Sequence, residues 1–125
     1  TWETNGYTLE PAPDNEYDFI MSHIVFQHIA NWSIRYSLLA DIHRILKPKG
    51  VALLHFMDLD GSVAYHADYP DPGETKPPLG LYNCRVEDER YLIEDLEEIG
   101  FLNVNIETGK DPFSTKKSYY VRGTK

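Results

Sequence analysis

The sequence contains little cysteine, little positive charge and no long apolar run. Its single cysteine, Cys84, excludes an intrachain disulfide and gives no support to a cysteine-based metal site. Twelve Lys and Arg residues are outnumbered by 20 Asp and Glu residues, and the formal charge of -8 argues against nucleic acid or a membrane surface as a partner. No apolar run reaches the roughly 18 residues that span a bilayer. These absences predict a soluble, cytoplasmic protein with a reduced thiol.

The histidines do not predict a metal site. No two of them stand four residues apart, as the paired ligands of a metalloprotease helix do. The five are His23, His28, His43, His55 and His66. We therefore expect no bound metal.

The chain does contain enough apolar material for one globular domain. Of its 125 residues, 42% are hydrophobic and 13% are aromatic, and these values exclude intrinsic disorder. A domain of this length buries roughly two-thirds of the surface of its unfolded chain. Residues 1–125 are therefore expected to form one domain.

Two apolar runs predict neighbouring parallel strands. Residues 17–21 and 51–57 have the length and the apolar character of strands that are covered on both faces. A helix is predicted between them, and a strand, helix and strand at this spacing form a βαβ unit. Because the strands of such a unit are parallel, the segments after Met21 and after Met57 are expected to lie side by side.

The helix between the two strands is predicted from apolar residues at helical spacing. The residues on one helical face are Ile34, Leu38, Ile42 and Ile45, with Leu39 and Leu46 widening the stripe. Asn31 or Ser33 is expected to cap its start. The stretch KPKG at 47–50 is expected to end it, because proline cannot continue the hydrogen-bond ladder and glycine permits a reversal.

The second half of the chain predicts a loop, a helix and two more strands. Residues 60–85 are rich in proline and glycine and are expected to contain no regular element. Helical spacing resumes over 87–99 and stops at Gly100. Residues 101–108 and 118–122 have strand character, and the short link between them excludes a helical crossover, so they are expected to run antiparallel. The predicted fold class is α/β.

This order of elements resembles the C-terminal half of the class I S-adenosylmethionine-dependent methyltransferase fold, which has a Rossmann-like sheet. The segments YDFIMSHIVFQHI and LLADIHRILKPKGVALLHFMD are similar to strand four, the following helix and strand five of the family, in its type 11/25-like group. The turn at 44–50 reads RILKPKG where R-L-K-P-G-G recurs in the family, so Lys49 replaces a glycine. The resemblance extends over residues 5–121.

The resemblance implies a site for S-adenosylmethionine at the carboxyl ends of the strands, where ligands lie in open α/β sheets. Backbone groups around Ser22 and His23 are expected to contact the methionine part of this cofactor. Asn5 and Gly6 correspond to the position that hydrogen-bonds the adenine, with Asn5 replacing the commoner aspartate. An alternative role for Ser22 is to cap the helical turn that follows.

Three further residues could serve function or structure. His28 and Asp58 each have one interpretation of either kind, and His55 has a structural interpretation only. His28 is the candidate catalytic residue, because a histidine side chain can act as a general base. The alternative is that His28 is a hydrogen-bonded packing residue. His55 lies inside a predicted strand and is interpreted as a core residue. Asp58 ends the second strand and is expected either to contact the substrate or to cap a loop.

The long loop at 60–85 holds the remaining substrate candidates. By resemblance, members of the family place substrate-recognition segments here, and loops on rigid scaffolds carry specificity. The candidate residues are Tyr65, His66, Asp68, Tyr69 and Tyr82. The alternative is a surface excursion whose aromatic residues cover the sheet.

The first three strands of the family and its glycine-rich turn are absent from this sequence, which contains no G-x-G. That turn supplies much of the cradle of the cofactor. Without the first strands, the strand at 17–21 would have an open apolar edge, which native proteins cover or pair. We therefore expect this edge to be covered by the missing N-terminal half of a longer methyltransferase, by a second copy of the chain or by another chain.

Two functions follow. The first is methyl transfer from S-adenosylmethionine to a small molecule or a protein side chain by a longer parent enzyme. Catalysis would then depend mainly on the proximity and orientation of the two reactants. The segment after the first strand lacks an Asn/Asp-Pro-Pro-aromatic motif, which argues further against DNA as the acceptor. The second is a noncatalytic methyltransferase-like module that dimerises through its exposed sheet edge and binds no cofactor.

Overall fold

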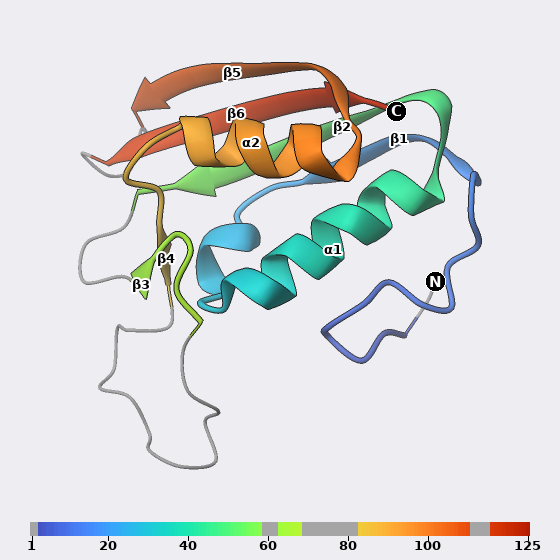
Figure 1. Ribbon diagram of the computed structural model, residues 1–125, viewed down its shortest axis with the longest axis horizontal. Coiled ribbons are helices and arrows are strands. Elements are labelled where there is room, and N and C mark those ends of the chain that lie inside the picture. The colour runs from blue at the N-terminus through green and yellow to red at the C-terminus, as the bar shows by residue number, and fades with distance from the viewer. Residues whose placement is uncertain (1–2, 59–62, 69–82, 111–115) are drawn as a thin grey trace.

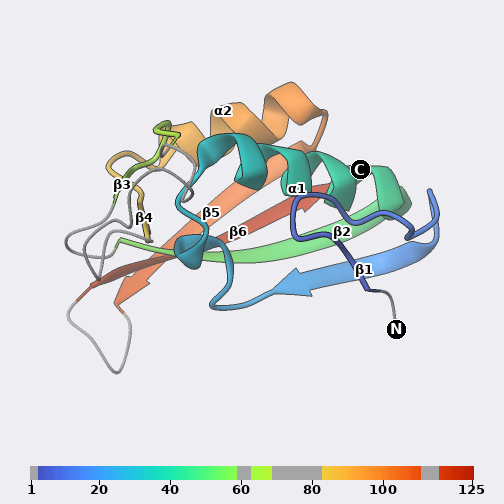
Figure 2. The same ribbon diagram turned by 90° about the horizontal axis from the view of Figure 1, so that it is seen from below.

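The computed structural model describes residues 3–58, 63–68, 83–110 and 116–125. Its main sheet has the strand order β1-β2-β6-β5, and both helices lie on the same face of this sheet (Figures 1 and 2). The strands are β1 (Tyr17–Ser22), β2 (Leu46–Met57), β5 (Leu102–Lys110) and β6 (Lys117–Thr124). The helices are α1 (Trp32–Ile45) and α2 (Arg90–Ile99), and a short 3₁₀ turn, η1 (Phe26–His28), follows β1.

The pairing of the strands confirms the predicted topology. β1 runs parallel to β2, with Met21 beside Leu53 and Ser22 beside Leu54. β5 and β6 are antiparallel, as predicted. β6 also pairs antiparallel with β2, so the last strand of the chain lies inside the sheet between β2 and β5. The sequence analysis did not predict this insertion.

The prediction that the strand at 17–21 is covered on both faces is wrong. Phe19 is 54% exposed and Met21 is 64% exposed, whereas Ile20 packs against the core. The reason is that β1 is an edge strand and the helices cover only one face of the sheet. An apolar run shows that a strand is suited to burial but does not show what covers it.

The core lies between the helices and the sheet. Its buried residues include Leu39 and Ile42 of α1, Leu54 and Phe56 of β2, and Leu96 of α2. Of the predicted stripe, Ile34 and Leu38 are only half-buried. The structure therefore confirms the helix but shifts its buried face toward Leu39.

The ends of the helices differ in detail from the prediction. α1 starts after Asn31, which makes no side-chain cap hydrogen bond. The cap comes from Asp68, whose carboxylate accepts hydrogen bonds from the Ser33 amide and hydroxyl, both at 2.9 Å. α2 starts at Arg90, later than predicted, and Gly100 ends it with a φ of 115°. That left-handed conformation favours glycine.

The long connection contains two short strands, so the prediction of no regular element over 60–85 is wrong at both ends of the segment. β3 (Val63–Ala64) and β4 (Cys84–Arg85) pair in parallel and form a second, two-stranded sheet. In the described ranges, neither helix has the length and apolar character that crossing a membrane would require.

The turn between α1 and the body of β2 depends on a glycine for space. Lys49 has a φ of 69°. A Cβ atom added to Gly50 would lie 2.8 Å from the Lys47 carbonyl oxygen and 3.2 Å from the Tyr17 carbonyl oxygen. Because both neighbours are backbone atoms, they cannot move aside without disturbing the start of the β1–β2 pair.

We therefore predict that Gly50→Ala lowers the free energy of unfolding by about 1–3 kcal/mol, the usual range for an overpacked site. Gly109→Ala is the matched control, because a Cβ atom there meets nothing within 4 Å, and it should change stability by less than about 0.5 kcal/mol. Urea unfolding followed by circular dichroism measures both. Equal stability of the two variants would contradict the predicted clash.

Candidate functional site at the carboxyl edge of the sheet

The tips of β1 and β2 bring three of the predicted site residues to one edge of the sheet. Ser22 is half-buried at the end of β1, His23 follows it and is exposed, and Asp58 follows β2. The Asp58 amide donates to the Lys117 carbonyl at 3.0 Å, which fixes the chain where it leaves β2. β2 continues past its last pair with β1, which joins Leu54 to Ser22. The shared edge is the arrangement that the sequence predicted.

The turn after β1 rests on the part of β2 that extends beyond this pair. The His23 ring stacks on His55, with their centroids 4.6 Å apart. The Ile24 amide donates to Nδ1 of His55 at 3.3 Å. Phe26 of η1 stacks on Phe56, with centroids 5.1 Å apart. His55 is 2% exposed, so it is buried as predicted, but it lies outside the core between the helices and the sheet.

His28, the candidate general base, lies in η1 and is exposed. Its Nδ1 is 2.9 Å from the side-chain oxygen of Asn83, which immediately precedes β4. With that oxygen as acceptor, Nδ1 carries the proton and Nε2 is the basic nitrogen of the neutral ring. The contact can therefore orient the ring, and it joins η1 to the far end of the long connection. Its catalytic role stays a prediction.

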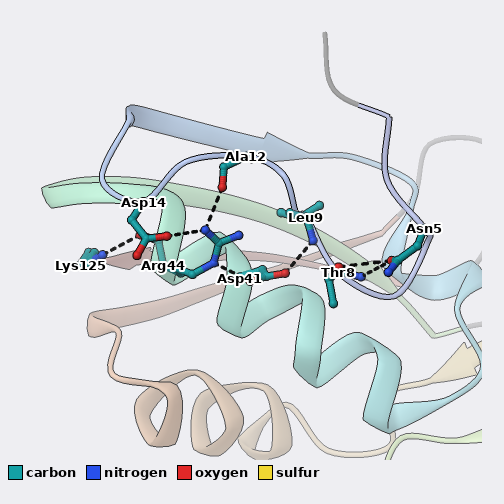
Figure 3. A network of polar contacts seen from close by, with 8 residues as sticks. All are labelled: Asn5, Thr8, Leu9, Ala12, Asp14, Asp41, Arg44 and Lys125. Carbon is teal, nitrogen blue, oxygen red and sulfur yellow. Dashed lines mark hydrogen bonds and ion pairs between the residues drawn. The ribbon is translucent and has the colours of Figure 1, made fainter.

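Asn5 and Gly6 form a turn of their own, and Asn5 is shown in Figure 3. The Asn5 side-chain oxygen accepts hydrogen bonds from the Tyr7 amide at 2.8 Å and the Thr8 amide at 2.9 Å. Gly6 has a φ of 83°, a conformation that favours glycine. Since the Asn5 side-chain oxygen already accepts the hydrogen bonds of this turn, the side-chain NH₂ group of Asn5 would make any hydrogen bond to an adenine. The proposed contact with the adenine stays a prediction.

Two charged residues of α1 tie the N-terminal segment to the helix (Figure 3). The Asp41 carboxylate accepts from the Leu9 amide at 2.6 Å. Arg44 donates to the Ala12 carbonyl at 2.8 Å and forms ion pairs with Asp14 and Asp41. These contacts hold the segment that carries Asn5 and Gly6 beside α1.

Tyr65, a predicted substrate residue, lies in the interior. It is fully buried, and its hydroxyl donates to the Asp95 carboxylate at 2.8 Å. The Trp32 indole N–H donates to the same carboxylate oxygen at 2.9 Å, and His66 Nε2 lies 3.8 Å from the other oxygen. Burial, and then the Asp95 charge, raise the pKa of Tyr65. Tyr65 is therefore a protonated donor that joins the loop to α2.

Arg35 is a fully buried cation that the sequence analysis did not identify. Its guanidinium donates to the carbonyls of Ile29, Ala30 and Tyr65, and it lies 5.0 Å above the Tyr65 ring. A buried charge is tolerated when it is hydrogen-bonded in this way. His28 is the last residue of η1, and Ile29 and Ala30 follow it directly. Arg35 thereby joins the end of η1 to the loop that carries Tyr65 and His66.

A cavity of about 390 Å³ adjoins this loop. It is lined by Ala64, Tyr65, His66, Ala67, Glu87 and Tyr91. His66, another predicted substrate residue, thus borders a hollow, but a substrate contact by His66, Tyr65 or Asp58 stays a prediction. Tyr69 and Tyr82 lie outside the described residues.

Two further features limit the chemistry of the site. Cys84 is fully buried in β4, and this burial raises the pKa of its thiol to about 11, so it is protonated at neutral pH. In the described parts of the chain, no three His, Cys, Asp or Glu side chains are grouped to hold a metal ion.

We predict that Tyr65→Phe lowers the free energy of unfolding by about 1–2 kcal/mol, because the buried Asp95 carboxylate loses a hydrogen-bond donor. Tyr120→Phe is the matched control, since Tyr120 is 37% exposed, and we expect its effect to stay below about 0.5 kcal/mol. Denaturant unfolding of both variants tests this. A Tyr65→Phe variant as stable as the control would show that the hydroxyl does not support Asp95.

Comparison with known proteins supports the same family. Residues 2–54 match the family model of the methyltransferase domain, a segment that includes β1, α1 and most of β2. No curated protein matches the sequence.

Solved structures share the fold at low sequence identity. A S-adenosylmethionine-dependent methyltransferase from Methanosarcina mazei has a TM-score of 0.65 and 15% identity over 98% of this chain and 65% of its own. The 1,6-didemethyltoxoflavin-N1-methyltransferase of Burkholderia thailandensis, solved with that substrate and S-adenosylhomocysteine, has a TM-score of 0.64 and 21% identity over 93% of this chain and 47% of its own.

A structure described as that of a possible exported protein from Bordetella parapertussis has a TM-score of 0.63 and 16% identity over 98% of this chain. This chain spans 42% of that protein, and its share of each of the three structures is less than two thirds. The strand order and these structures show that the chain shares the fold of S-adenosylmethionine-dependent methyltransferases, and the match of residues 2–54 supports the resemblance to a methyltransferase domain.

Proposed function

We propose that this chain is the C-terminal half of a methyltransferase domain, spanning residues 1–125, that transfers a methyl group from S-adenosylmethionine to a small molecule or a protein side chain. The observation that carries the proposal is the shared edge formed by the parallel tips of β1 and β2, with Ser22, His23 and Asp58 on it. The family match to residues 2–54 supports it, because that segment contains the β1 tip.

The residues at this edge fit the cofactor chemically. The backbone and hydroxyl of Ser22 and the exposed imidazole of His23 are suited to the polar methionine part, and Asp58 is suited to a substrate group or to the ammonium of the cofactor. When bound, S-adenosylmethionine supplies an electrophilic methyl group on a sulfonium. A glycine-rich turn, which would complete the cradle, has to come from another segment or chain because this sequence contains none.

His28 is proposed to receive a proton where the acceptor must lose one. Its Nδ1 contact with Asn83 leaves Nε2 as the basic nitrogen, and the side chain is exposed to an approaching group. His66 and the adjoining cavity are proposed to contact the acceptor. The rest of the catalytic effect would come from placing the acceptor in line with the methyl group.

We predict that S-adenosylhomocysteine binds this chain with micromolar affinity in isothermal titration calorimetry. His23→Ala should weaken binding about three- to tenfold, the loss expected for one polar contact. His43→Ala is the matched control, because His43 packs against Phe101 near the other end of α1, and it should leave the affinity unchanged. Absence of binding by the wild-type chain would contradict a retained half-site.

A second candidate function is a noncatalytic module that dimerises through β1. Two observations favour it. Phe19 and Met21 are exposed on this edge strand. An apolar hollow of about 350 Å³ lies beside the same strand. It is lined by Thr4, Leu9, Ala12, Tyr17, Phe19, Ile20 and Ile45. Exposed apolar edges are common pairing surfaces.

This candidate predicts that the chain is a dimer in sedimentation equilibrium and that Met21→Lys makes it monomeric, because a charge on the edge opposes pairing. Leu102→Lys is the matched control on the opposite edge strand, where Leu102 is 61% exposed, and it should remain dimeric. A monomeric wild-type chain would rule out the dimerising module, whatever the result of the cofactor titration.

A further inference from the structure

The turn after β1 contains a residue in an unfavourable backbone conformation. Ile24 has a φ of 57°, in the left-handed region. This conformation is unfavourable for a non-glycine residue, and for a β-branched residue it is rare. Such a conformation persists when the surrounding structure holds it. The contacts around Ile24 therefore determine the shape of the strand tip.

Two neighbouring residues of β2 hold the turn from opposite faces of the sheet. The Ile24 amide donates to His55 at 3.3 Å, and Phe26 stacks on Phe56, which belongs to the core under the helices. Successive residues of a strand point to opposite faces, so His55 lies on the face away from the helices. The chain thus crosses the end of β1 between residues 24 and 26, and Ile24 provides the change of direction.

His55 is itself held in place by two neighbouring rings. Its centroid lies 4.6 Å from that of His23 and 4.8 Å from that of Tyr120 of β6, and the His23 and Tyr120 centroids are 6.4 Å apart, so the three rings form one cluster. The ring is almost completely buried. Because Nδ1 accepts the Ile24 amide, the neutral ring carries its proton on Nε2. Its position and tautomer are therefore matched to one backbone N–H group.

We propose that His55 is a positioning residue for the cofactor half-site. By accepting the Ile24 amide, it fixes the backbone of residues 22–24, which include Ser22 and His23, the two residues that are proposed to contact the methionine part of the cofactor. The effect of His55 on cofactor binding rests on the proposed function. The structural part, that His55 sets the conformation of the turn, is independent of any ligand.

Two substitutions separate the hydrogen bond from ring stacking. His55→Phe keeps an aromatic ring beside His23 and Tyr120 but removes the acceptor. His55→Asn keeps an acceptor oxygen at the position of Nδ1 but removes the ring. Amide hydrogen exchange by NMR is measured for Ile24 and, as an internal reference for global stability, for Leu54 in the ladder of β2.

We predict that His55→Phe accelerates exchange of the Ile24 amide about five- to tenfold relative to Leu54, as expected for the loss of one hydrogen bond. His55→Asn should keep this ratio within about twofold of the wild type. Acceleration of both amides together in His55→Phe, or equal behaviour of the two variants, would overturn the proposal, because a general packing role would have that effect.

Titration with S-adenosylhomocysteine tests the consequence for binding. His55→Phe should weaken the affinity about five- to tenfold, and His55→Asn should restore it to within about twofold of the wild type. An affinity unchanged in His55→Phe would overturn the positioning role in binding. If the wild-type chain does not bind, the proposed function fails, while the exchange ratio still decides whether His55 sets the turn.

Discussion

The parallel pairing of β1 with β2 is the constraint on which the candidate site depends. If the two strands were antiparallel, Asp58 would lie at the opposite end of the sheet from Ser22 and His23. The pairing also stops at Ser22 and Leu54, while β2 continues to Met57. This difference in length leaves a short surface of β2 against which the next residues of the chain pack. The strand tip is therefore a structured turn, with a ring contact on each face of the sheet.

A second constraint acts on the loop side of the site, where two charged residues are buried. Arg35 is bonded to three backbone carbonyls, and Asp95 accepts from Tyr65 and Trp32. Burying either charge without these partners would cost several kcal/mol. The charges lie on α1 and α2, and their partners come from the segment after η1, from the start of α1 and from the loop. The same contacts that satisfy the two charges thus fix the loop relative to His28.

The sequence predicted the elements of the fold because their signals are local. The apolar run at 51–57, the helical spacing after Ile34 and Gly100 each reflect the conformation of a few adjacent residues. It also predicted that Ser22 and Asp58 share an edge, since parallel topology dictates this.

The remaining features depend on partners distant in the sequence. The cap of α1 by Asp68 joins residues 35 positions apart, and the burial of Arg35 requires a carbonyl of Tyr65. The exposure of Phe19 and Met21 depends on the absence of a covering layer on one face of the described sheet, and an apolar run carries no information about that layer. The contact of His28 with Asn83 likewise exists only once the long connection has returned to η1.

The open edge and the candidate cofactor half-site are parts of the same strand, and this links the two proposed functions. A strand added to β1 would run beside residues 17–22 and would end next to Ser22 and His23 if it were parallel. A segment that carries a glycine-rich turn at that point would complete a cradle around the strand tips. A second copy paired antiparallel would instead place the start of its own β1 there, without such a turn. The direction of the strand that covers β1 therefore determines whether the edge completes a cofactor site or only an interface.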